Sequence, residues 1–278
     1  MAVSRRSLIW APLAALVSPR LALGAEIHPI PEIAAALERI YNFDFDAAHQ
    51  KLDAFIAAHP EHPLGYSFRA SAYLFGELDR LRILESEFLT DDDKIQADEN
   101  LAASPRIREA FIEAIQASDR LALAEPDKDV SALFALCMNE GMTTDYMAFI
   151  EKRRIASLSH AKRSQNFAVD LMHRYPAFVD AKLTSGVSEY LLGSLPFFLR
   201  WFVRMPEVQG DKSKAIDNLN AVARDGRYLA PFARILLAIV HLREKRPAQS
   251  RALLEGLVRD YPENALLRQE LTKLSRRK

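Results

Sequence analysis

Residues 231–264 constrain the fold most, because this stretch reads as a complete helical hairpin. Two segments, 232–243 and 248–261, are joined by a short polar turn and closed by Pro262. Their apolar residues recur at spacings that place each set on one face of an α-helix. These residues are Ile235, Leu236, Ile239 and Val240 in the first segment, and Leu253, Leu254, Leu257, Val258 and Tyr261 in the second. Neither helix can bury its face alone, so further hairpins must stack on this one.

The same pattern recurs along the chain, and few glycines interrupt it. We expect four to five hairpins with a C-terminal helix covering the last, and Asp46 as the N-cap of the second helix. Extra length falls at 81–100, 143–157 and 193–211. The other predicted helices span 33–40, 45–58, 64–81, 107–123, 130–141, 158–175, 180–192, 213–223 and 265–275, punctuated by Pro60, Pro126, Pro176, Gly226 and Pro262.

Residues 231–264 resemble the tetratricopeptide repeat family, whose unit is a helix–turn–helix with the pattern W-x2-L-G-x2-Y…A-x3-F…P. The corresponding residues are Arg234, Leu237, Ala238, His241, Ser250, Leu254 and Pro262. The spacing agrees, and so do the sizes at the aliphatic and small positions, whereas Arg234 and His241 depart from the aromatic slots. The resemblance implies an all-α superhelical array of helix–turn–helix hairpins with inserted segments. Such an array is a binding scaffold rather than an enzyme.

The first twenty-five residues are typical of a signal peptide. Arg5 and Arg6 precede an apolar run of about ten residues, too short to span a bilayer, and small residues follow it. The motif around the two arginines also resembles the twin-arginine export signal, so a Sec or a twin-arginine route stays open. We therefore expect a cleaved leader over 1–25, a single repeat domain over 26–278, and a periplasmic or secreted location.

Composition and motifs exclude several classes of function. The formal net charge is zero, which argues against binding nucleic acid. Cys137 is the only cysteine and lies in an apolar run, so we expect a buried packing thiol, with a reactive thiol as the alternative. His59 and His62 flank a carboxylate, but two prolines make a polar turn the better reading than a metal site. The acidic run 91–93 lacks the spacing of a calcium loop. No catalytic motif and no cofactor site is predicted.

The aromatic run 195–203 is the most unusual segment. We expect Phe197, Phe198 and Trp201 to fold back against the helix 180–192 as a core plug, in which case Trp201→Ala costs about 3–5 kcal/mol. An exposed partner-binding surface is the alternative, and contact with a membrane surface is a weaker form of it.

The family resemblance also places the first helix of each hairpin on the concave surface of the array. The residues expected there are Leu64, Leu133, Cys137, Leu183, Val187, Tyr190, Phe232, Ile235 and Ile239. The candidate binding surface is therefore Leu183, Val187, Tyr190, Phe197, Phe198, Trp201, Phe232 and Ile235. We expect an exported scaffold for a protein or peptide partner. The alternative is a carrier of an apolar small molecule or lipid in an enclosed helical cavity.

Overall fold

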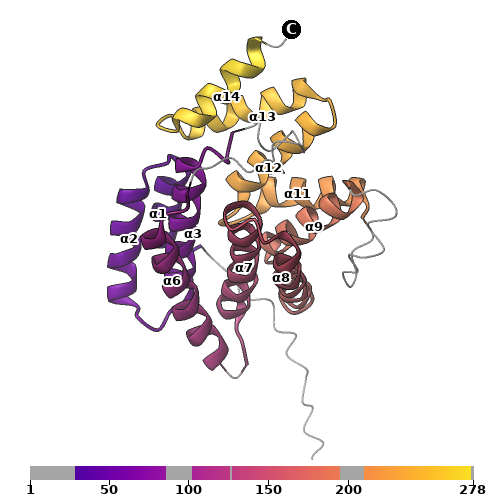
Figure 1. Ribbon diagram of the computed structural model, residues 1–278. Coiled ribbons are helices and arrows are strands. Elements are labelled where there is room, and N and C mark those ends of the chain that lie inside the picture. Colours follow the sequence, from indigo (N-terminus) through magenta and orange to yellow (C-terminus); the bar gives the residue numbers. More distant parts are fainter. Residues whose placement is uncertain (1–28, 86–101, 126, 195–209, 277–278) are drawn as a thin grey trace, which may run out of the picture.

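The structure is a computed structural model that describes residues 29–85, 102–125, 127–194 and 210–276. All regular structure in these residues is helical, which confirms the predicted all-α class. The helices pack in adjacent pairs along the chain (Figure 1). The pairs are α1 (Pro31–Tyr41) with α2 (Phe45–Ala58), α3 (Pro63–Arg80) with α6 (Pro105–Ala124), α7 (Val130–Asp145) with α8 (Arg154–Arg174), α9 (Lys182–Ser194) with α11 (Lys212–Asp225), and α12 (Ala230–Arg243) with α13 (Pro247–Asp260). The last helix, α14 (Ala265–Arg276), covers α13.

In four of the hairpins, the second helix carries a small residue at the same distance from its end. A small residue, three turns before the end of the helix, is fully or almost fully buried and lets the partner helix approach closely. On the first helix of the fourth hairpin the facing residue is Gly186, where an added Cβ would lie 3.0 Å from Leu219 and 3.2 Å from the carbonyl of Ala215. The small residues of these second helices are Ala48, Ser164, Ala215 and Ser250.

The turns between hairpins repeat as well. His59, Tyr175 and Tyr261 each end a second helix with φ near −130° and ψ near 65°. The carbonyl of each accepts a hydrogen bond from the backbone N–H three residues later, over 2.8–3.2 Å. A proline follows each of them and disfavours the helical conformation at the residue before it, which is why the helices stop there. The predicted helix ends at Pro60, Pro176 and Pro262 are therefore confirmed.

Two local predictions are wrong. Asp44, not Asp46, caps α2, because its carboxylate accepts a hydrogen bond from the Ala47 N–H over 3.1 Å, while Asp46 lies inside the first turn. The helix predicted to end at Gly141 continues to Asp145 and then into the π-helix η1 (Tyr146–Ile150). The π-helix is held by the ring of Tyr146, which stacks on Phe111 at 4.7 Å. This contact with α6 was not visible in the local sequence.

The long connections all fall within hairpins, between a first and a second helix. They are residues 81–104, 146–153 and 195–211, whereas the turns between hairpins hold only a few residues each. Because stacked hairpins run in the same sense, the helix ends that these connections join lie along one edge of the array. We call this the insertion edge.

The array closes on itself through Tyr228, in the turn before α12. Its hydroxyl accepts a hydrogen bond from the Ile30 N–H over 3.0 Å, and its carbonyl accepts one from the Tyr41 hydroxyl over 2.9 Å. The ring packs against Phe68 and Phe134, which come from α3 and α7. The first hairpin thus contacts the C-terminal helices, which lie beside it in Figure 1. The centre of the array at this level is filled by aromatic rings.

The position of Tyr228 depends on Asp180, which lies in the short 3-10 helix η2 (Val179–Ala181). Its carboxylate is 1% exposed and accepts hydrogen bonds from three successive backbone N–H groups, those of Arg227, Tyr228 and Leu229, over 2.7–3.0 Å. A buried carboxylate is stable in the core when its lone pairs are satisfied in this way. Asp180 therefore fixes the turn that closes the array.

Candidate binding cleft

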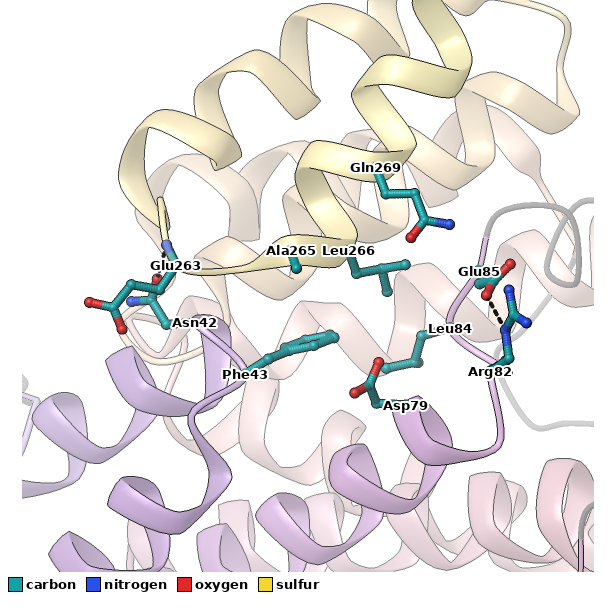
Figure 2. A pocket seen from close by; sticks show the side chains of 10 residues that line it. All are labelled: Asn42, Phe43, Asp79, Arg82, Leu84, Glu85, Glu263, Ala265, Leu266 and Gln269. Carbon is teal, nitrogen blue, oxygen red and sulfur yellow. Dashed lines mark hydrogen bonds and ion pairs between the residues drawn. The ribbon is translucent and has the colours of Figure 1, made fainter.

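A cleft of about 530 Å³ lies where the first two hairpins meet α14. It has one side from the α1–α2 turn, one from the end of α3, and a third from the start of α14 (Figure 2). Its apolar walls come from a phenylalanine, two leucines and an alanine, and carboxylates and amides surround them. The lining residues are Asn42, Phe43, Asp79, Arg82, Leu84, Glu85, Glu263, Ala265, Leu266 and Gln269.

The ends of α1 and α3 form part of the cleft wall, and both end in the same backbone geometry. Phe43 follows α1 and Arg82 follows α3, each in the left-handed region with φ near 60°. In both places the next N–H reaches back to a carbonyl in the last turn, as Asp44 does to Arg39 and Ile83 to Leu78, both over 2.9 Å. This Schellman geometry usually takes glycine at the left-handed position. It recurs at Lys245 between α12 and α13, so it belongs to the turns of the array rather than to the cleft alone.

The C-terminal wall is attached to the α1–α2 turn by hydrogen bonds. The Asn42 side chain accepts one from the Glu263 N–H over 3.1 Å, and the Asn264 side chain donates one to the Tyr41 carbonyl over 2.8 Å. Arg39 forms an ion pair with Glu263 at 3.4 Å. Asn264 also caps α14, since it accepts a hydrogen bond from the Leu267 N–H. The cleft is therefore bounded by segments that are firmly connected to each other.

Glu85 and Asp79, two of the carboxylates that line the cleft, differ in their partners. Glu85 pairs with Arg82 at 2.6 Å and with Lys273 at 3.4 Å. Burial acts to raise the pKa of Glu85, but the hydrogen bonds from Arg82 and Lys273 hold it below its ordinary value. Asp79 has neither a hydrogen bond nor an ion pair to its carboxylate among the described residues, and burial, followed by the charge of Glu85, raises its pKa. Within the part of the chain that the structure describes, Asp79 therefore holds the unpaired carboxylate of the cleft.

Asp79 has a counterpart on the neighbouring first helix. Asp79 follows Phe68 on α3 by about three turns, and Asp145 follows Phe134 on α7 by the same interval, so each aspartate lies on the helix face that carries a ring against Tyr228. Burial raises the pKa of Asp145 to about 7. Both aspartates therefore lie toward the interior of the array at its insertion edge. Neither aspartate stands out in the sequence, because an isolated aspartate near a helix end is usually a solvated residue.

Two buried glutamates hold the ends of the long connections. Glu77 is fully buried and accepts hydrogen bonds from Arg80 and from the Ser104 N–H over 2.7–2.8 Å. Glu189 accepts hydrogen bonds from the N–H groups of Gly210 and Asp211. In both glutamates burial acts to raise the pKa, and these hydrogen bonds, together with one from Lys214 to Glu189, lower it instead. The connections 81–104 and 195–211 thus rejoin the array at fixed places.

The predicted binding residues on α9 and α12 lie in helix-packing clusters. Leu183 and Tyr190 are buried against α11 and α12, and Val187 and Phe232 are partly buried in the same cluster. Phe232 also meets Phe75 edge to face, with ring centroids 5.4 Å apart. The remaining member of this set, Ile235, is partly buried in the next cluster, with α13 and α14. Phe197, Phe198 and Trp201 lie outside the described residues, so their contact with α9 stays a prediction.

Three other residues expected on the concave surface are core residues, and a fourth is partly exposed. Leu64, Leu133 and Cys137 are each at most 2% exposed and share one cluster. Ile239, on α12, is partly exposed. The thiol of Cys137 lies 3.3 Å from the Thr184 hydroxyl, and burial raises its pKa, which confirms the packing thiol. These residues are buried because helices of adjacent hairpins contact each other directly at this level.

The two histidines of the 59–62 turn have structural contacts. His59 ends α2, and the His62 ring accepts a hydrogen bond from the Leu64 N–H at the start of α3. Both rings pack against Phe55. Nowhere in the described ranges do three or more His, Cys, Asp or Glu side chains gather closely enough to hold a metal ion. The acidic run 91–93 lies outside those ranges.

No protein-family model, no curated protein and no solved structure matches the chain. Within the described residues, no helix combines the length and the apolar character needed to cross a membrane. Fold and cleft together define an all-α protein of the helical-repeat class, with a closed array and expanded connections on one edge.

Proposed function

We propose that the chain is an exported helical-repeat scaffold that binds a protein or peptide partner along its insertion edge. The observation that carries this proposal is that all three long connections leave and rejoin the array at helix ends on that edge, while the turns between hairpins stay short. In repeat proteins, insertions gather on one face, which is often the binding face. The cleft of Figure 2 opens beside the first of these connections, since Arg82, Leu84 and Glu85 line it.

The export part of the proposal rests on the sequence of residues 1–25, and the resemblance to tetratricopeptide repeats supports the scaffold class. A carrier of apolar molecules would need an enclosed apolar cavity. The centre of the described array is occupied by Phe68, Phe134 and Tyr228, which pack on one another. The scaffold therefore has the better support.

The test is capture of a partner from the extracytoplasmic fraction of the source cells, with two matched variants. In the first, a short Gly-Ser linker replaces residues 195–209, whose flanking glycines Gly193 and Gly210 are in contact. In the second, a linker of the same composition lengthens the turn at Glu61, on the opposite edge. We expect wild type and the second variant to retain the same partner, and the first variant to lose it. Equal capture by both variants, or no capture by the wild type, would contradict the proposal.

A further inference from the structure

One of the carboxylates that line the cleft of Figure 2 has no partner among the described residues. Three carboxylates line it, those of Asp79, Glu85 and Glu263, against the single guanidinium of Arg82. Glu85 is paired with Arg82 at 2.6 Å and with Lys273 at 3.4 Å, and Glu263 is paired with Arg39; Lys273 and Arg39 lie outside the lining. What remains is the carboxylate of Asp79, which has no partner in the described residues and whose pKa is raised by burial. A half-buried carboxylate of this kind gains most from a cation brought by a ligand.

The walls next to this carboxylate are apolar. Figure 2 shows the ring of Phe43 and the side chains of Leu84 and Leu266 around the space into which the Asp79 carboxylate points. Gln269, exposed on α14, forms the lip and offers an amide to a backbone. A ligand that fits must therefore have a cationic end, an apolar stem and neighbouring groups that hydrogen-bond. The volume of about 530 Å³ exceeds one side chain and suits a few residues of extended peptide.

We propose that this cleft binds a basic side chain of an extended peptide, with Asp79 as its counter-ion and Phe43 and Leu266 in contact with its stem and with an apolar neighbour. A lysine or arginine stem is itself apolar and packs on such walls while its charged end reaches a carboxylate. The proposal rests on the scaffold function above and names the chemistry of the partner segment.

The test is a titration of the purified protein with short peptides, followed by calorimetry and by NMR shifts. The probe is acetyl-Leu-Lys-Leu-amide, the matched analogue has norleucine in place of lysine, and spermidine serves as a free polyamine. We expect the lysine peptide to bind at least about tenfold more tightly than the norleucine peptide and more tightly than spermidine. Equal binding of the two peptides, or tighter binding of spermidine, would overturn the proposal.

Two variants locate the binding. Asp79→Asn removes the counter-ion, and Gln269→Lys places a competing ammonium at the lip on an exposed helical position that tolerates substitution. Each is expected to abolish the preference for lysine over norleucine, whereas Glu61→Gln, an exposed acid on the other edge, leaves it unchanged. A preference that survives both cleft variants would overturn the proposal.

The outcomes also separate this proposal from the scaffold function. If wild type and Asp79→Asn capture the same partner equally well, the scaffold holds and the role of the cleft fails. If the lysine peptide binds through Asp79 but no partner is captured, the cleft holds and the scaffold function fails.

Discussion

Removal of the Asp180 carboxylate should open the closure of the array, and the structure allows the cost to be worked out. Three N–H donors, those of Arg227, Tyr228 and Leu229, point at this one side chain, and that of Tyr228 is fully buried. In Asp180→Ala the buried N–H of Tyr228 is left unpaired, which lowers the free energy of unfolding by about 1–3 kcal/mol. Each of the two half-buried N–H groups lowers it by less, because water reaches them in part. The expected loss in the free energy of unfolding is therefore about 3–5 kcal/mol.

Asp180→Asn provides a graded comparison. The amide oxygen can keep the two hydrogen bonds from Tyr228 and Leu229, which share one carboxylate oxygen, while its NH2 group faces the Arg227 N–H. We expect a loss of about 1–2 kcal/mol. Urea unfolding followed by circular dichroism measures both values. Asp217→Ala, at an exposed position on α11, is the control and should change the free energy by less than about 0.5 kcal/mol. If Asp180→Ala resembled this control, the reasoning about closure would be refuted.

Three further predictions concern burial at single positions. Burial in the folded protein raises the pKa of Asp145 from 3.8 to about 7. Between about pH 4 and pH 7 the folded state therefore keeps a proton that the unfolded state releases. Stability falls as the pH rises through this range. Asp145→Asn should therefore be more stable than wild type by about 1–3 kcal/mol at pH 8 and nearly equal at pH 4 in urea unfolding, and an equal gain at both pH values would count against this reasoning. Gly186→Ala should lower stability by about 1–3 kcal/mol in thermal unfolding, because the added Cβ meets Leu219. The matched Gly256→Ala, where the added Cβ has no neighbour nearer than 3.8 Å, should raise stability by up to about 1 kcal/mol. Equal effects of the two substitutions would refute the close approach of α9 and α11 at Gly186. Cys137 should react with a thiol reagent only after urea unfolds the protein, and fast reaction of the folded protein would disprove its burial.

Most of the fold could be predicted from local pattern. The prolines at 60, 176 and 262 end helices because each restricts the residue before it, and that restriction is a property of two neighbouring residues. The small side chain at Ser250 was visible from the repeat spacing, since close approach of two helices needs a small side chain whatever the rest of the fold.

The closure and the cleft could not be predicted in this way. Tyr228 contacts Ile30 and Tyr41 across nearly two hundred residues, and no local periodicity contains such a pair. Asp79 stands out only in the folded chain, where α14 meets the end of α3 and its carboxylate lies among apolar walls with no partner in the described residues. The role proposed for Asp79 depends on neighbours in space that the local sequence does not reveal.

The bonds from Tyr228 and Asn264 to the first hairpin give the molecule a mechanical property that open arrays lack. An open stack of hairpins bends and stretches like a spring, because each unit touches only the next. Here a displacement at one end is opposed at the other through Ile30 and Tyr41, so the described helices resist deformation together. A partner would therefore meet a rigid surface of fixed curvature, and would itself have to supply the adjustment that binding requires.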